Sequence, residues 1–235
     1  MPKSGCSPGY LPEAAYQARA KAALDRLYQE VAVQWYPFRG EGRDMYAPRV
    51  DIAVGPFAIE RRYIDEYTDL MRATRSFIEN LIEQHNHNAR GIGQPLEFDD
   101  VLHFNDNARC LIAIEIEEWG GRKHCLGNLV NASSLGRIGI LVARTPTVLR
   151  TFLRQRTFFQ FLEDVGKNTF KTANALVLSE AQFDECLQRI PERLQGNGQE
   201  DWLRPRHEDL AESPPDDPIV FHVRPLPRSR RTGRR

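Results

Sequence analysis

Three acidic side chains in two apolar segments are the residues of this sequence best suited to chemistry. Glu115 and Glu117 lie in CLIAIEIEEW, and Asp51 lies in VDIAV. In a strand, side chains alternate between the two faces, so both glutamates point to one face and the isoleucines of their segment to the other. Carboxylates buried side by side repel each other and lose hydration, and Mg²⁺ or Mn²⁺ would relieve both costs. The alternative is a strand whose second face is solvated.

Asp51 strengthens the metal interpretation. An aspartate in an otherwise apolar, β-branched strand needs a reason to be there. Two neighbouring strands could bring Asp51 onto Glu115 and Glu117. The three acids together predict an oxygen-ligand site for a divalent cation.

The elements that must position these acids follow from hydrophobic periodicity and from glycine and proline signals. Strands are expected at 50–57, 110–119, 137–143 and 173–180, and helices over 12–36, 61–88, 124–136, 146–166 and 180–189. Strands that alternate with helices indicate an α/β fold, with a mixed central sheet flanked by helices on both faces.

This order of elements and acids resembles the PD-(D/E)xK nuclease superfamily, whose fold is restriction endonuclease-like. The resemblance covers roughly residues 20–143 and rests on Asp51 in APRVDIAVGP and on Glu115 and Glu117 in IAIEIEEW. It implies that Asp51 and Glu115 hold Mg²⁺ or Mn²⁺. It also implies a hydrolase that cleaves phosphodiester bonds.

The sequence departs from the superfamily pattern in two respects. Glu117 stands where the superfamily usually has lysine, which leaves the general base open, and Lys123 is the nearest replacement. The chain also runs 64 residues from Asp51 to Glu115, so residues 61–100 are expected to form a helical insertion between the two motif strands. Glu30, expected on the first helix, resembles an extra acid that some members supply from that element.

In such a site the cation would activate a bound water, and Glu117 or a nearby lysine would orient or deprotonate that water. Asn128 and Asn131, three residues apart on one helix face, could reach a phosphate or the water. Hydrogen bonding to neighbouring loops is the alternative for both asparagines.

The charge distribution points to a polyanionic partner. The chain has 32 basic and 32 acidic residues, but residues 224–235 (RPLPRSRRTGRR) carry six arginines and no acid, so the remainder has 26 basic residues against 32 acidic ones. Such a tail would attract nucleic acid without sequence preference. The alternative is a solubilising end. The predicted nucleic-acid-binding residues are Arg228, Arg230, Arg231, Arg234 and Arg235.

The remaining features set the class of protein. The four cysteines form no C-x-x-C pair, so a zinc ribbon or disulfide framework is not expected. No apolar run is long enough to span a bilayer, and no apolar stretch follows the first lysine, so a cytoplasmic protein is expected.

We therefore expect one nuclease-like domain over residues 1–211 and a mobile basic tail over residues 212–235. The expected function is a Mg²⁺-dependent endonuclease that acts on DNA, with RNA possible as the substrate, without a membrane partner and as a possible homodimer. The alternative is a non-catalytic nucleic-acid-binding or assembly module with the same fold.

Overall fold

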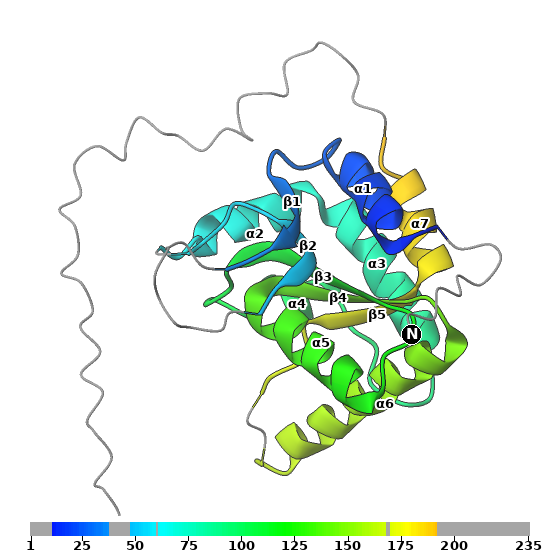
Figure 1. Cartoon of the computed structure of the whole chain (residues 1–235). Helices are drawn as coiled ribbons and strands as arrows, with labels where there is room; N and C mark the ends of the chain where they lie inside the picture. The colour runs from blue at the N-terminus through cyan, green and yellow to red at the C-terminus, as the bar shows by residue number, and fades with distance from the viewer. Residues whose placement is uncertain (1–10, 38–47, 60, 168–169, 192–235) are drawn as a thin grey trace, which may run out of the picture. The chain divides into compact units, whose positions relative to one another are not determined.

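The computed structural model describes residues 11–37, 48–59, 61–167 and 170–191, all within one compact unit, Met1–Gly196 (Figure 1). Its elements, in chain order, are α1 (Glu13–Leu24), β1 (Val31–Trp35), β2 (Val50–Val54), α2 (Ile64–Ala73), α3 (Arg75–Asn88), α4 (Phe98–Leu102), β3 (Cys110–Glu117), α5 (Arg122–Leu135), β4 (Gly136–Ala143), α6 (Pro146–Asp164), β5 (Ala175–Ser179) and α7 (Glu180–Gln188). The predicted basic tail, 212–235, lies outside the described residues.

The five strands form one mixed sheet in the order β1-β2-β3-β4-β5. The pairs β1–β2 and β2–β3 are antiparallel, whereas β3–β4 and β4–β5 are parallel. The strand β3 is therefore central. Its carboxyl end lies beside the amino end of β2, because the two strands are antiparallel. This topology confirms the predicted α/β fold with a mixed sheet flanked by helices.

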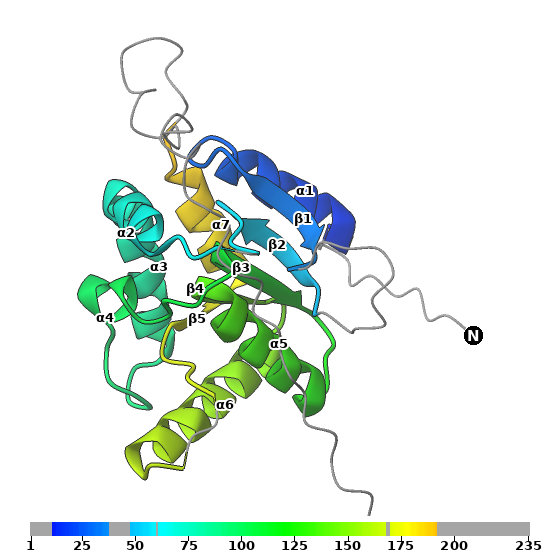
Figure 2. The ribbon, with the colours of Figure 1, turned by 90° about the vertical axis from the view of Figure 1, so that its left-hand side faces the viewer.

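Helices cover both faces of this sheet. In Figure 1, α1, α3 and α7 lie above it and α5 and α6 below it, and Figure 2 shows the same two layers from the side. The main core cluster joins α1–α4 and α7 to the isoleucine face of β3. A second cluster joins α5 and α6 to β4 and β5, and a third contains Ala113 together with Val50 and Ala53 of β2. Ile114 and Ala113 thus face different layers, which confirms the predicted alternation along β3.

The predicted helix over 12–36 is correct only in its first half. The helix α1 ends at Leu24, and Val31–Trp35 forms the edge strand β1, which pairs with β2 from Val31 opposite Val54 to Trp35 opposite Val50. The apolar residues of this segment fit a helical period, but the β-branched Val31 and Val33 also suit a strand. Tertiary pairing with β2 decided between the two.

The segment between β2 and β3 holds the helices α2, α3 and α4, so this part of the chain is helical, as predicted. The remaining predicted helices and strands match α5, β4, α6, β5 and α7 within a few residues at their ends. The short α4 was not predicted. No helix among the described residues is long and apolar enough to cross a membrane.

Candidate active site

The three predicted acids lie on neighbouring strands, where the amino end of β2 is beside the carboxyl end of β3. The register pairs Ile52 with Ile114, so one further step along the ladder places Asp51 opposite Glu115. Glu117 lies two residues further along β3 on the same face. A 2.7 Å hydrogen bond from the backbone N–H of Ile116 to Asp51 Oδ2 ties the two strands together at this point.

Glu115 is nearly enclosed, with 4% of its surface exposed. Its Oε1 accepts a 3.4 Å hydrogen bond from the Asn131 side-chain amide of α5. Burial raises the pKa of Glu115 to about 9, and the nearby charges of Asp51 and Glu117 act in the same direction. The hydrogen bond from Asn131 opposes this rise without cancelling it. In the absence of a cation, the Glu115 carboxyl is therefore predominantly protonated at neutral pH.

Asp51 is partly buried and is held by two glutamines on its other side. Its Oδ1 accepts hydrogen bonds from Gln17 Nε2 of α1 (3.2 Å) and Gln34 Nε2 of β1 (3.1 Å). The two glutamines are joined by a 3.0 Å bond from Gln34 Nε2 to Gln17 Oε1. Burial raises the pKa of Asp51 to about 6, the hydrogen bond from Ile116 lowers it, and the charge of Glu13 raises it further.

Gln34 reaches Asp51 from a strained backbone. It has a φ of +52° and is the only described residue other than glycine with positive φ. Its position in the ladder, between the pairs Val33–Ile52 and Trp35–Val50, is opposite Asp51. A left-handed conformation costs a non-glycine residue about 1–2 kcal/mol. The strained residue is thus one that donates a hydrogen bond to Asp51. Backbone strain is often found at functional sites.

Glu117 has a different environment from the other two acids. Its Oε1 accepts hydrogen bonds from three successive backbone N–H groups, those of Glu118 (3.1 Å), Trp119 (3.1 Å) and Gly120 (2.7 Å). Its Oε2 accepts a 3.2 Å hydrogen bond from Asn128 Nδ2. The carboxylate therefore caps the turn between β3 and α5, which is a structural task in addition to its place beside Glu115.

The other predicted site residues are placed as follows. Lys123 lies in the exposed first turn of α5, and no hydrogen bond among the described residues joins it to the three acids. Glu30 is not on the first helix, because that helix has already ended. Its carbonyl accepts a 2.8 Å hydrogen bond from the N–H of Gly55, which directly follows β2 and is four residues from Asp51 in the chain. Within α1, Glu13 is the acid nearer to the site, through its hydrogen bond with Gln17. Arg228, Arg230, Arg231, Arg234 and Arg235 lie outside the described residues.

The donor types suit a divalent cation, although both oxygens of Asp51 and one oxygen of Glu115 already accept hydrogen bonds. No three His, Cys, Asp or Glu side chains gather into a metal-binding group within the described segments. The Glu117 carboxylate accepts hydrogen bonds from the turn that follows β3. Mg²⁺ is commonly bound through one or two carboxylates, with waters and substrate phosphates completing its shell. Asp51 and Glu115 meet that requirement, and neither forms an ion pair with a cationic side chain in the described chain.

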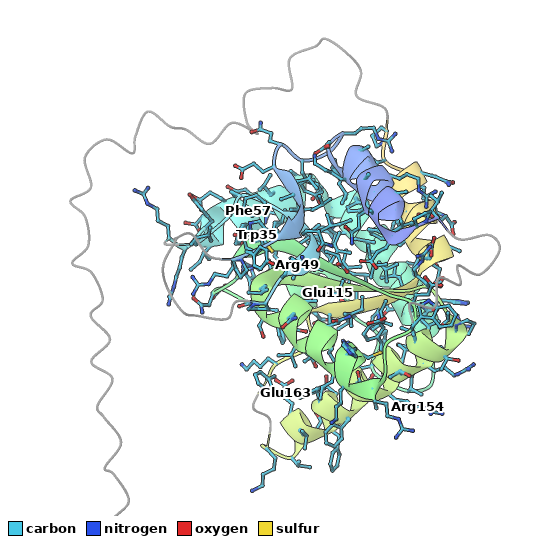
Figure 3. All side chains as sticks on the ribbon, in the orientation of Figure 1. Trp35, Arg49, Phe57, Glu115, Arg154 and Glu163 are labelled. Atoms are coloured by element: carbon cyan, nitrogen blue, oxygen red, sulfur yellow. The ribbon has the colours of Figure 1, made fainter. Side chains whose placement is uncertain are left out.

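An aromatic and cationic surface lies next to the acids. Trp35 and Phe57 stack with their ring centroids 4.9 Å apart, and Arg49 lies over the Tyr36 ring at 5.9 Å. Tyr36 is 52% exposed, and Arg49 precedes Asp51 by two residues in the chain. Arg49 directly precedes β2, the strand that carries Asp51, and Trp35 lies on β1, which pairs with β2 (Figure 3). A phosphate and a flat ring are the groups that this surface could receive.

Sequence reasoning missed the two glutamines. Gln17 was treated only as part of a helix, and Gln34 was assigned to the same helix although it lies on β1. The one available signal in the sequence was a polar residue on the apolar side of a predicted helix. In the structure this residue, Gln17, is 4% exposed. Its partner could not be inferred while β1 remained unrecognised.

Comparisons with models of protein families, with curated proteins and with solved structures found no match for this chain. A function can therefore be inferred only from the geometry of Asp51, Glu115 and the amides around them.

Proposed function

We propose that this protein is a metal-dependent phosphodiesterase that cleaves DNA, with Asp51 and Glu115 as the ligands of Mg²⁺ or Mn²⁺. The observation that carries this proposal is the position of two carboxylates side by side on adjacent strands. Both are largely buried, and no cationic side chain among the described residues forms an ion pair with either. Buried like charges are costly unless they share a proton or a cation. A site that holds such a pair is suited to binding a divalent cation.

When bound, the cation would polarise the phosphoryl oxygen, lower the pKa of a water and offset charge on the leaving oxygen. The chain supplies the surroundings. Gln17 and Gln34 fix one oxygen of Asp51, and Asn131 fixes one oxygen of Glu115. Because both oxygens of Glu117 already accept hydrogen bonds, Glu117 is the weaker candidate for the general base. We assign contacts with the scissile phosphate to the exposed Lys123.

The substrate is proposed to be nucleic acid, with DNA preferred to RNA. Arg49 and Tyr36 would hold a phosphate and a base or sugar next to Asp51, and the Arg-rich end would add affinity without sequence preference. We further propose that the sheet belongs to the restriction endonuclease-like class. The antiparallel β1–β2–β3 meander, the acids on β2 and β3 and the parallel β4 support that assignment. Such an enzyme would act in the cytoplasm.

The test is a cleavage assay on supercoiled plasmid, single-stranded DNA and RNA, with Mg²⁺, with Mn²⁺ and with chelator. Glu115→Gln and Asp51→Asn remove one ligand charge each with little change of shape. The matched control is Glu163→Gln, the same substitution at a partly exposed position on α6 (Figure 3). We expect metal-dependent cleavage by the wild type and by Glu163→Gln, and none by either site variant.

The hydrogen bonds of Glu117 to the turn after β3 favour a second candidate function. In that case the protein is a nucleic-acid-binding module, and the acids stabilise its fold. That function predicts a gel shift with plasmid that neither chelator nor Glu115→Gln alters, and no cleavage under any condition. Those two results together would overturn the catalytic proposal. Cleavage that survives both site variants would also overturn it, because Asp51 and Glu115 would then not hold the metal.

A further inference from the structure

The outer face of α6 carries a run of large apolar side chains in contact with solvent. Phe158 and Phe161 are each 56% exposed, and Val165, which directly follows the helix, is 49% exposed. Phe170, just beyond, is 44% exposed. The carboxyl-terminal half of α6 extends beyond the sheet in both Figures 1 and 2. Several exposed aromatic rings close together in the chain mark a surface that binds another molecule.

This face is distinct from the one that attaches α6 to the domain. The inner face buries Val148, Phe152, Leu153 and Phe159 against α5, β4 and β5. The outer residues are spaced by four, three and four positions, from Arg154 through Phe158 and Phe161 to Val165. That spacing is the seam of a two-helix coiled coil. α6 therefore has one seam buried in the domain and a second seam that is unpartnered among the described residues.

From this seam we propose that α6 pairs with α6 of a second copy of this chain, in antiparallel orientation about a two-fold axis between Phe158 and Phe161. The axis places Phe158 of each copy against Phe161 of the other. It also places Arg154 of each copy beside Val165 and Asp164 of the other. A two-fold interface must be complementary to itself, and this face meets that condition.

Charge selects the antiparallel orientation and favours a second copy as the occupant. Arg154 lies toward the amino end of the seam and Asp164 at its carboxyl end, and within the described residues neither forms an ion pair. Antiparallel pairing brings opposite charges together at both ends. Parallel pairing would bring like charges together, Arg154 beside Arg154 and Asp164 beside Asp164. An unrelated partner would not need this matched pattern of cation, two rings and anion.

The experiment is sedimentation equilibrium of the full chain over a range of concentrations, with chelator present. The wild type should show a reversible monomer–dimer equilibrium. Phe161→Glu should weaken the dimer by about thirtyfold or more, because a central aromatic contact is replaced by a buried charge. Leu126→Glu is the control, since Leu126 is 39% exposed on a different helix, and it should leave the equilibrium unchanged.

A charge exchange tests the orientation. Arg154→Glu and Asp164→Lys should each weaken the dimer by about fivefold, and the double variant should restore it. A wild type that stays monomeric at the highest concentration would overturn the proposal. So would a dimer that persists in Phe161→Glu, or single charge variants that the double variant does not rescue. Far-ultraviolet circular dichroism of each variant excludes unfolding as the cause. None of these outcomes depends on nuclease activity.

Discussion

At the residue scale, Glu115 couples the acid site to pH. Its pKa is about 9 in the folded protein against an ordinary value of 4.5, so the folded state binds this proton more tightly than the unfolded state. The stabilisation is complete below pH 4.5 and is lost as pH rises toward 9. For the metal-free protein, the free energy of unfolding should therefore fall between pH 6.5 and pH 9. Asp51, with a pKa of about 6, contributes mainly below that range.

Glu115→Gln should remove most of this slope, because the neutral amide resembles the protonated carboxyl. At pH 8 the variant should be more stable than the wild type by about 2 kcal/mol. Urea unfolding in chelator at several pH values measures both quantities. Glu163→Gln should keep the wild-type slope. An equal slope in wild type and Glu115→Gln would show that this carboxyl is not held protonated.

Two substitutions of Gln34 can separate the effect of backbone strain from the effect of the side-chain amide. Gln34→Gly removes the cost of the +52° φ and also removes the amide that donates to Asp51. Gln34→Ala removes the same amide but keeps the strain. We expect Gln34→Gly to be more stable than Gln34→Ala by about 1 kcal/mol, as measured by urea unfolding. Equal stability of the two variants would contradict strain at this position.

At the scale of elements, the approach of α5 to β4 depends on one glycine. A Cβ on Gly139 would lie 2.8–3.0 Å from the backbone of Ala132 and Ser133. Those atoms cannot move without displacing α5, the helix that carries Asn128 and Asn131. Gly139→Ala should therefore destabilise the protein by about 2 kcal/mol and reduce any activity of the acid site.

Gly127 is the matched control on α5. A Cβ there would meet nothing within 4 Å, so Gly127 takes no part in close packing of this helix. Gly127→Ala should stabilise the helix by about 0.5–1 kcal/mol. Thermal unfolding of the two alanine variants should show shifts of opposite sign. A loss of stability in both variants would mean that helix packing tolerates neither side chain.

The edge strand β1 shows how an element can be hidden in a sequence. Residues 12–36 have a helical period, and the period gave no reason to divide the segment. The division at Leu24 reflects pairing of Val31–Trp35 with β2, which is 15 or more residues away in the chain. Local patterns do not contain the free energy of such a contact, so they could not reveal β1 or the role of Gln34 on it.

At the scale of the whole molecule, a cation that binds Asp51 and Glu115 should stabilise the fold, because ligand that binds only the native state shifts the unfolding equilibrium. Binding requires both carboxylates to lose their protons, so the effect should grow with pH. Saturating Mn²⁺ should raise the thermal midpoint by roughly 5–10 °C at pH 8.5 and by less at pH 6.5.

The same titration on Asp51→Asn and Glu115→Gln should show little or no shift, whereas Glu163→Gln should behave as the wild type. A shift of equal size in all four proteins would place the cation elsewhere. The measurement needs no substrate, so it distinguishes loss of metal binding from loss of a later step.

Local sequence patterns were enough to predict most of the secondary structure, the alternation of faces along β3 and the presence of three acids on two strands. These properties depend on side-chain periodicity and on glycine and proline signals, which act over a few residues. They were enough to predict the α/β class and the helical insertion.

The groups that surround each acid depend on tertiary contacts. The pairing of β2 with β3 put Asp51 opposite Glu115, and the edge strand β1 and helix α1 brought Gln34 and Gln17 to Asp51. The Glu117 carboxylate accepts hydrogen bonds from the turn after β3, whereas the sequence alone predicted that Glu117 and Glu115 both belong to the site. Contacts between segments distant in the chain fix burial and hydrogen bonding, and these set the pKa of each carboxyl.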